Sequence, residues 1–175
     1  MSVPAITRQP AELHYAIAQC SLGSVLIARA ERGVCAVLLG DDPESVTSEL
    51  EKRFPHAALL RRDQELAQYL SQVVGLIEAP GRPLDLLLDL RGSTFQQRVW
   101  QALREIPVGT TSTYAEVASR IGAPKAVRAV ARACATNPLA LVVPCHRVIG
   151  KSGSLTGYRW GLERKRMLLD RESQR

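Results

Sequence analysis

The chain has 175 residues, 46% of them hydrophobic and 23% charged, so it is long enough and apolar enough to bury a core. No apolar run approaches about 18 residues, and no basic start leads into an apolar stretch with a cleavage site, so we expect neither a membrane span nor export. The net charge is +6, and no acidic residue occurs between Glu116 and Glu163, which favours a polyanionic partner such as nucleic acid.

The cysteines and histidines do not follow a metal-binding pattern. The four cysteines form no CxxC pair, and only three histidines occur in the whole chain. Without a secretory context the thiols are expected to be reduced. The sequence therefore predicts no metal site and no cofactor.

The first half of the chain has the texture of a small sheet with helices. Three short segments rich in β-branched or aromatic residues are predicted strands: 13–19, 24–30 and 34–40. A helix is predicted behind Asp42, with Pro43 at its first position, and a second one over 64–79. The leucine-rich segment 84–90 is predicted to be one more strand.

The second half is predicted to be helical. Its predicted helices cover 93–106, 113–122, 124–137 and 161–172. Thr113 and Glu116 have the spacing of a capping box, and Gly122 is a typical helix stop. Two short helices joined around this glycine form a helix-turn-helix pattern.

The helix predicted over 124–137 has two possible roles. It consists mostly of alanine and valine, from which Lys125, Arg128 and Arg132 project. Alanines read few base edges, but they let a backbone approach DNA closely while arginines reach phosphates. We favour DNA binding by charge and shape, and the alternative is a packing helix with solvated arginines.

An apolar run, LALVV, ends at Pro144 and presents Cys145 next to His146. A cysteine reacts as its thiolate, which nearby cations and proton acceptors favour. Successive side chains of a strand point to opposite sides, so a base at His146 needs a bridging water or a tight turn after Pro144. Glu172 is the carboxylate best placed to orient the imidazole. The alternative is a small buried cysteine, a core histidine and a surface charge.

These residues resemble the O6-alkylguanine-DNA alkyltransferases. The resemblance rests on FQQRVWQALREIPVGTTSTYAEVA, IGAPKAVRAVARA, NPLALVVPCHR and LTGYRWGLERKRMLL, which cover most of residues 92–172. The front half, YAIAQCSLGSVLIARAERGVCAVLLGDDP, is similar to the C-terminal repair half of bacterial Ada proteins. The Pro-Cys-His-Arg core is highly specific in this setting.

The resemblance implies a single-use DNA repair methyltransferase that acts by direct reversal. It implies minor-groove binding, flipping of the damaged guanine, and irreversible transfer of the O6 alkyl group, with O4 of thymine as a further substrate, to Cys145. His146 becomes a water-relayed base and Glu172 its orienting carboxylate. Arg128 matches the arginine that fills the vacated space, and Tyr114 matches the tyrosine that helps to turn the nucleotide out.

The resemblance also implies a pocket for the alkylated guanine. Its residues are Tyr114, Asn137, Val148, Tyr158, Arg159, Trp160 and Lys165. Backbone carbonyls at Cys145 and Val148 face the guanine amino group, and Lys165 supports the site. Asn137 joins the recognition helix to the active-site turn, although an asparagine before proline is also typical of plain turns.

Two positions depart from the family pattern. Many members have serine where this chain has Arg159, so only the backbone contact carries over there. Trp160 is bulky, and we expect it to narrow the tolerance for benzyl-sized adducts. The zinc ligands of animal members, and the zinc and regulatory segments of full Ada proteins, have no match.

The sequence thus predicts an α+β fold in two domains. Residues 1–91 form a small antiparallel sheet with helices, like ribonuclease H, and residues 92–175 form a winged-helix-like DNA-binding domain. We expect a bacterial, cytoplasmic, nucleoid-associated monomer. Three rivals remain: a lesion-binding relative without repair activity, which lacks the cysteine; a helix-turn-helix regulator; and a cysteine hydrolase, which turns over and needs no DNA.

Overall fold

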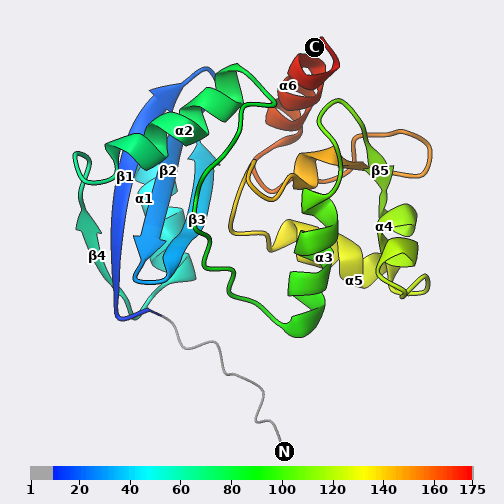
Figure 1. Cartoon of the computed structure of the whole chain (residues 1–175), viewed down its shortest axis with the longest axis horizontal. Coiled ribbons are helices and arrows are strands. Elements are labelled where there is room, and N and C mark those ends of the chain that lie inside the picture. The colour runs from blue at the N-terminus through cyan, green and yellow to red at the C-terminus, as the bar shows by residue number, and fades with distance from the viewer. Residues whose placement is uncertain (1–9, 175) are drawn as a thin grey trace, which may run out of the picture.

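The computed structural model describes residues 10–174, and it has the expected α+β class (Figure 1). A four-stranded sheet is built from β1 Glu12–Cys20, β2 Gly23–Ala30, β3 Gly33–Gly40 and β4 Ala58–Arg61. The helices are α1 Pro43–Arg53, α2 Ala67–Glu78, α3 Thr94–Arg104, α4 Tyr114–Arg120, α5 Val127–Ala135 and α6 Leu162–Ser173. Short elements complete the fold: β5 Ser112–Thr113, β6 Val148–Ile149 and the 3-10 helix η1 Cys145–Arg147.

The sheet is mixed, so the prediction of a purely antiparallel sheet is wrong. Its strand order is β3-β2-β1-β4, with antiparallel pairs between β1 and β2 and between β2 and β3. β4 runs parallel to β1 at the other edge, in a register that pairs Leu13 with Leu59. The reason is the connection: α1 carries the chain back along the sheet from β3 at one edge to the start of β4 at the other, so β4 runs in the same direction as β3 and β1.

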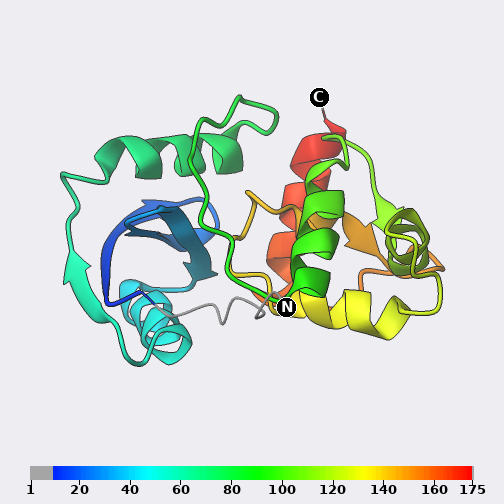
Figure 2. The same ribbon diagram turned by 60° about the horizontal axis from the view of Figure 1, so that its bottom comes forward.

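The sheet lies between two helices. α1 packs on β2 and β3, whereas α2 packs on β1 and β2, and Figure 2 shows the two helices on opposite faces. β2 and β3 therefore carry continuous apolar runs instead of alternating patterns, and Leu26, Ile27, Val37 and Leu38 are all fully buried. Burial on both faces makes this sheet a rigid support for the rest of the molecule.

Three of the predicted helix starts are confirmed at the atomic level, whereas the helices predicted from residue 64 and from Pro124 begin only at Ala67 and Val127, without a side-chain cap. The Asp42 carboxylate accepts a hydrogen bond from the Ser45 amide at 2.7 Å, ahead of α1. At α4 the Thr113 hydroxyl accepts from the Glu116 amide, and the Glu116 carboxylate accepts from the Thr113 amide. Ser93 caps α3 in the same way. These bonds satisfy amides that the first helical turn leaves without partners.

The prediction of a strand over 84–90 is wrong. The segment meets β3 only at an isolated bridge between Val34 and Leu88, and Leu87 is 72% exposed. Gly33 makes the approach possible, because a Cβ at this positive-φ residue would lie 2.4 Å from the Leu87 carbonyl oxygen. The segment is an extended connection that runs along the edge of the sheet toward α3 (Figure 1).

Residues 138–140 fasten the chain ahead of η1 to the sheet. The Val37 amide donates to the Pro138 carbonyl and the Ala140 amide donates to the Val37 carbonyl, both at 2.9 Å. Trp100 on α3 is buried and donates from its indole nitrogen to the Ala133 carbonyl of α5. The sheet, α3 and α5 thus share one apolar core, and the segment that carries Cys145 is anchored within it.

Candidate functional site

A cavity of about 580 Å³ opens beside Cys145. It is lined by Tyr114, Ala131, Cys134, Ala135, Cys145, Thr156, Gly157, Tyr158 and Arg159. The wall on one side belongs to α5, and the opposite wall belongs to the loop 156–159 between β6 and α6. The first residue of α4, Tyr114, completes it. A largely apolar cavity with a thiol in its wall suits a flat, uncharged group.

Cys145 and His146 lie on a tight turn, and the apolar run before them is not a strand. The Cys145 amide donates to the Val143 carbonyl at 2.8 Å, and the Arg147 amide donates to the Pro144 carbonyl at 3.0 Å. In a 3-10 helix successive side chains lie about 120° apart rather than on opposite sides. This turn, one of the two routes expected from the sequence, directs Cys145 to the cavity while His146 points elsewhere.

Asn137 holds the segment that carries the thiol. Its side-chain amide donates to the Val143 carbonyl at 2.9 Å and to the Cys145 sulfur at 3.3 Å, while its oxygen accepts from the Leu139 amide at 2.9 Å. The side chain is fully buried, so these partners are not exchanged for water. Asn137 therefore supplies hydrogen bonds to the backbone of this segment in place of a neighbouring strand. It also donates a hydrogen bond to the Cys145 sulfur.

The pKa of Cys145 is raised to about 11. Burial is the main cause, since it disfavours the charged thiolate, and the hydrogen bond from Asn137 and the positive charge of Lys165 oppose the rise. At neutral pH the resting thiol is thus protonated. A nucleophile at this position needs a base that removes its proton during the reaction.

His146, Arg147 and Glu172 form a buried network behind the thiol. The His146 Nε2 atom lies 2.8 Å from Glu172 Oε1, and Arg147 donates to both carboxylate oxygens from Nε and to Oε1 from its terminal nitrogen. Arg147 also donates to the Ile106 carbonyl at 2.8 Å. The last turn of α6 and the turn η1 are thereby joined through one carboxylate.

The charges in this network set the state of the imidazole. Burial alone would raise the pKa of Glu172, but hydrogen bonds from His146 and Arg147 outweigh it and bring the pKa to about 2. Burial lowers the pKa of His146, so the ring is neutral at pH 7. A carboxylate beside Nε2 keeps the proton on that nitrogen. Nδ1 is then an acceptor, and it is buried without a partner in the part of the chain that the structure describes.

Lys165 ties down the loop wall. It is fully buried, and its ammonium group donates to the carbonyls of Val148 at 2.6 Å, Gly157 at 3.1 Å and Thr156 at 3.3 Å. Burial lowers its pKa. The Tyr114 hydroxyl donates to the same Thr156 carbonyl at 3.0 Å. The cavity walls are therefore held by hydrogen bonds from α4 and α6.

The predicted pocket residues fall into two groups. Tyr114, Tyr158 and Arg159 lie on the cavity wall. Asn137, Val148 and Lys165 lie behind it, where they position Cys145 and the loop.

Trp160 is not among the residues that line this cavity, but it lies beside it. Its ring is 4% exposed and borders a separate depression next to α6. The ring packs edge-on against Tyr158, with centroids 5.4 Å apart, so it supports the wall from outside.

The basic residues predicted for DNA binding share the outer side of α5 and the turn before it. Lys125, Arg128 and Arg132 are exposed, whereas Val130, Ala133 and Cys134 face the core. The exposed side of α5 therefore carries positive charge directly above the cavity wall that Ala131, Cys134 and Ala135 form. An anionic polymer lying on this side would pass the cavity mouth.

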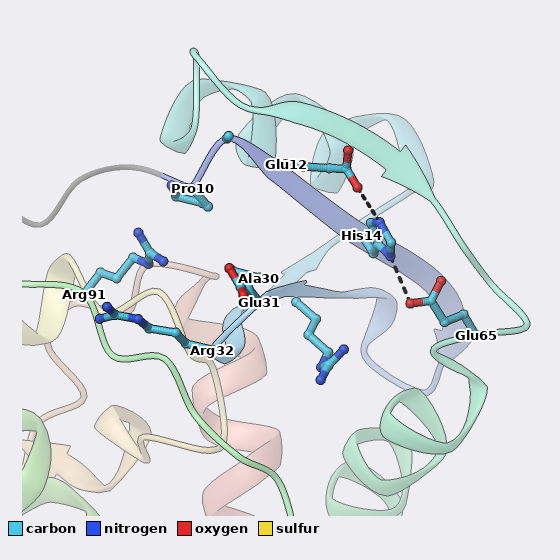
Figure 3. Close-up of a pocket in the computed structure, with 10 residues that line it drawn as sticks. Pro10, Glu12, His14, Ala30, Glu31, Arg32, Glu65 and Arg91 are labelled. Atoms are coloured by element: carbon cyan, nitrogen blue, oxygen red, sulfur yellow. Dashed lines mark hydrogen bonds and ion pairs between the residues drawn. The ribbon is translucent and has the colours of Figure 1, made fainter.

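A second cavity, of about 490 Å³, lies at the far end of the sheet (Figure 3). In its wall the His14 imidazole lies between two carboxylates: Nε2 is 2.8 Å from Glu12 Oε1, and Nδ1 is 2.9 Å from Glu65 Oε1. Both hydrogen bonds raise the pKa of His14. The lining residues contain no thiol or hydroxyl nucleophile, and acids and bases alternate around it, so we assign no chemistry to this cavity.

Sequence reasoning missed two residues of the site. Arg147 holds Glu172 bidentately, and its only sequence signal is its place in the Pro-Cys-His-Arg core. Cys134 contributes a second thiol to the cavity wall. This residue is 7% exposed, and burial raises the pKa of its thiol as well. Neither role follows from local spacing, because the contacts join residues from separate elements.

Residues 10–174 contain neither a cluster of metal-ligating side chains nor a helix that could span a membrane. Within residues 10–174, no three His, Cys, Asp or Glu side chains converge as metal ligands do. No helix in that range combines the length and the apolar character needed to cross a membrane.

Two family models match consecutive parts of the chain. The ribonuclease-like domain of 6-O-methylguanine DNA methyltransferase matches residues 13–89, and the DNA-binding domain of the same family matches residues 94–174. Together they span the sheet with its helices and the part that contains the cavity.

Curated relatives and a solved structure agree with these models. The chain is 51% identical over 162 residues to the bifunctional transcriptional activator/DNA repair enzyme Ada of Escherichia coli, covering 93% of this chain and 46% of the relative. It is 42% identical to the inducible methylated-DNA–protein-cysteine methyltransferase of Bacillus subtilis, over 85% of this chain and 83% of the relative. The Mycobacterium tuberculosis OGT in complex with DNA superimposes with a TM-score of 0.76 at 37% identity, over 92% and 93% of the two chains. The chain thus spans less than half the length of the Ada protein it matches.

Proposed function

The chain belongs to the 6-O-methylguanine DNA methyltransferase family, and on this premise we propose that it repairs DNA by moving an alkyl group from guanine O6 to Cys145. The observation that carries the proposal is the buried path from the Cys145 turn to Glu172, at the wall of an apolar cavity. The cavity has the lining that a purine with a small alkyl group requires. O4-alkylthymine is a second candidate substrate.

The chemical step is a single displacement. The Cys145 sulfur attacks the alkyl carbon, the S–C bond forms, and the C–O6 bond breaks with its electron pair moving onto guanine. The guanine anion takes up one proton at N1, which balances the proton that Cys145 gives up, and the normal base remains in the strand. A thioether is a very poor leaving group, so the thiol does not return and each molecule acts once.

The proposed base is His146, acting through one water molecule. Its Nδ1 atom is an acceptor, buried and without a partner among residues 10–174, and Glu172 holds the opposite nitrogen. A proton taken from Cys145 would convert the ring to an imidazolium ion, which the carboxylate stabilises. Such a base is needed because a thiol with a pKa of about 11 is protonated at neutral pH. Proton removal is then coupled to attack instead of preceding it.

We propose that α4 and α5 form a helix-turn-helix unit that binds the DNA minor groove, within a winged-helix-like domain. The support is the exposed basic side of α5, with Lys125 and Arg132 placed to reach phosphates. The target base is stacked inside the duplex, so it must be flipped out to reach the thiol. Arg128 would fill the vacated space, and Tyr114, at the cavity wall, would turn the nucleotide. The small side chains of α5 permit the close approach.

The domain boundary that fits this function lies between residues 91 and 92. The preceding domain, with a sheet covered on both faces, would be ribonuclease H-like, as the name of the matching model suggests. Residues 1–9 and 175 of the two proposed domains lie outside the described residues. We further propose a monomer that works in the bacterial cytoplasm at the nucleoid.

Three alternative functions make different demands on the site. A lesion-binding protein without repair activity needs no thiol, whereas Cys145 is present and held by Asn137. A cysteine hydrolase needs open access for water and a thiolate that is regenerated, which the buried thiol does not favour. A sequence-specific regulator needs base-reading side chains on α5, where alanine and valine predominate.

The test is the mass of the intact protein after incubation with duplex DNA that carries one O6-methylguanine. We expect a gain of one methyl group per molecule, saturating at one. The gain should be absent in Cys145→Ala and present in Cys134→Ala, which removes the other thiol of the same cavity. Unchanged mass together with tight binding to the lesion would leave a recognition protein and would refute the proposed chemistry.

A further inference from the structure

Arg159 links the loop wall of the cavity to the other half of the molecule. Its backbone lies in the loop, but its guanidinium group leaves the cavity and donates from Nε to Glu49 Oε1 at 2.7 Å. Glu49 lies on α1, which packs on the sheet. A second nitrogen of Arg159 donates to the Ala135 carbonyl at the end of α5, at 3.4 Å. The side chain therefore bridges the loop and α5, the two walls that face each other.

Glu49 fastens a second part of the site through Arg53. The same Oε1 atom accepts from Arg53 Nε at 3.2 Å, and Arg53 donates from a terminal nitrogen to the Asn137 carbonyl at 3.3 Å. Asn137 is the residue that holds the Cys145 sulfur. One carboxylate on α1 thus reaches the loop wall through one arginine and the thiol segment through another.

The ion pairs of Glu49 are partly buried, which makes them stronger than pairs that are fully exposed to solvent. The side chain of Glu49 is 19% exposed and that of Arg53 is 16% exposed, so solvent screens the carboxylate only in part. Arg159 is 36% exposed, and its contact with Glu49 is the shorter of the two. A partly buried carboxylate between two guanidinium groups restrains both more firmly than an exposed surface pair would.

The other contacts of the loop hold its start and its α6 side, where Trp160 packs on Tyr158 and the Gly161 amide donates to the Tyr158 carbonyl at 3.0 Å. Lys165 and Tyr114 bind the carbonyls of Thr156 and Gly157, at the start of the loop wall. Toward α1 the wall ends in Arg159, whose side chain donates to Glu49 and to the Ala135 carbonyl. The Arg159 side chain, held by the Glu49 carboxylate, therefore ties this end of the loop to α5.

We propose that Glu49 is a positioning residue that sets the width of the alkylguanine cavity by holding Arg159 across the gap between the loop and α5. This inference rests on the proposed alkyl-transfer function. From the sequence, Trp160 is expected to limit adduct size. Under the proposal, this control belongs to the neighbouring Arg159 and to Glu49 on α1. A narrow cavity holds a methyl group in line with the sulfur, whereas a benzyl group needs the walls to separate.

The consequence of losing the carboxylate is a looser cavity rather than a weaker thiol. Dispersion contacts to a small group fall steeply when a wall recedes by even about 0.5–1 Å. Transfer of a methyl group should therefore slow when Glu49 is replaced. Transfer of a benzyl group should slow less or become faster, because its own ring can fill the wider space.

The experiment compares two lesions in one DNA sequence. Single-turnover rates are measured on duplexes that carry O6-methylguanine or O6-benzylguanine at the same position, so that contacts with the phosphates cancel in the ratio. The variants are Glu49→Gln, Arg159→Gln and the double replacement. Glu51→Gln is the matched control, since Glu51 is exposed on the same helix and no side-chain bond among residues 10–174 is shown for it.

We expect the benzyl-to-methyl rate ratio to rise about fivefold in Glu49→Gln and Arg159→Gln, the size of a coupling of ordinary strength. The double variant should show the same ratio as either single variant, because each change breaks the same contact between Glu49 and Arg159. Glu51→Gln should keep the wild-type ratio. A general loss of stability would slow both transfers alike and leave the ratio unchanged.

Two outcomes would overturn the inference, and they are distinguishable. If the wild-type protein takes up both alkyl groups and the ratio is unchanged in Glu49→Gln and Arg159→Gln, the positioning role of Glu49 is refuted. The proposed alkyl-transfer function would still stand. Wild-type protein that takes up neither group would refute the proposed function and this inference with it.

Discussion

Replacing Glu172 by glutamine keeps the size of the side chain but removes the charge that holds the His146 and Arg147 side chains. Glu172 accepts from His146 at 2.8 Å and from Arg147 at 2.8 to 3.1 Å, and it is 5% exposed. A glutamine offers one oxygen where the carboxylate has two, and its amide group would face a donor. At least one of the hydrogen bonds is therefore lost in Glu172→Gln.

The loss should be about 3 kcal/mol in the free energy of unfolding. Breaking a buried ion pair by removing one partner costs about 3–5 kcal/mol, and the low end applies because Arg147 keeps its bond to the Ile106 carbonyl. The lowering of the Glu172 pKa from 4.5 to about 2 corresponds to a similar stabilisation of about 3 kcal/mol. For a chain of this length the expected decrease in Tm is roughly 6–12 °C.

The pH dependence of this stabilisation has a definite direction. The folded-state pKa of Glu172 is about 2, below the ordinary value of 4.5, so the stabilisation is complete above about pH 5. It is lost as the pH falls from about 4.5 toward about 2, where the folded carboxylate takes up its proton. The difference in stability between wild type and Glu172→Gln should hence be constant at higher pH and shrink over this acid range.

Thermal unfolding and single-turnover methyl transfer test these expectations together. Loss of an oriented base should slow transfer by about 10²–10⁴-fold, in addition to the effect on Tm. Asp170→Asn is the matched control, because Asp170 is exposed on the same helix. If Glu172→Gln unfolded within 1–2 °C of wild type, by about 0.5 kcal/mol or less, and transferred methyl at the wild-type rate, the network would not have the role assigned to it.

Two further predictions follow from the residues around the thiol. Asn137→Ala leaves the buried Leu139 amide without its partner, while the Val143 carbonyl keeps its bond from the Cys145 amide, so urea unfolding should show a loss of about 1–3 kcal/mol; a loss below about 0.5 kcal/mol would mean that another group satisfies the Leu139 amide. Because the pKa of Cys145 is about 11 and the thiolate is the reactive form, its labelling by iodoacetamide should accelerate about tenfold per pH unit between about pH 7 and 10, followed by peptide mass; a rate that levels off below about pH 9 would contradict the raised pKa.

The elements that the sequence predicts well are those with local signals. The helix starts at Asp42 and Thr113 are marked by capping residues, and the structure confirms them. The first three strands are confirmed because turn residues separate apolar runs of the expected length. In each case the information lies within a few neighbouring residues, which is where capping and turn chemistry act.

The errors concern segments whose partners lie far away in the chain. The run 84–90 has the period of a strand, but only Leu88 finds a bridge, so most of its length stays unpaired. The run before Pro144 is apolar because it is buried, yet it bends: Leu141 has a φ of 72° and Asn137 supplies partners in place of a neighbouring strand. Composition alone does not separate a buried turn from a buried strand.

The candidate site was accessible from the sequence to different depths. The Pro-Cys-His-Arg motif points to Cys145 and His146, the small number of carboxylates in the second half points to Glu172, and the structure brings His146 and Glu172 into contact. The bidentate bond of Arg147 was not predicted, and neither was the reach of Glu49 into the cavity wall, since each needs the fold to place two distant elements together.

The distance along the chain between His146 and Glu172 has a consequence during synthesis. The two residues are 26 positions apart, and the carboxylate lies in the last turn of α6. A ribosome therefore produces the thiol and its imidazole well before it produces the group that orients them. A chain that stops short of Glu172 carries the Cys145 thiol without the carboxylate that orients its imidazole, so under the proposed mechanism such a chain should transfer alkyl groups slowly.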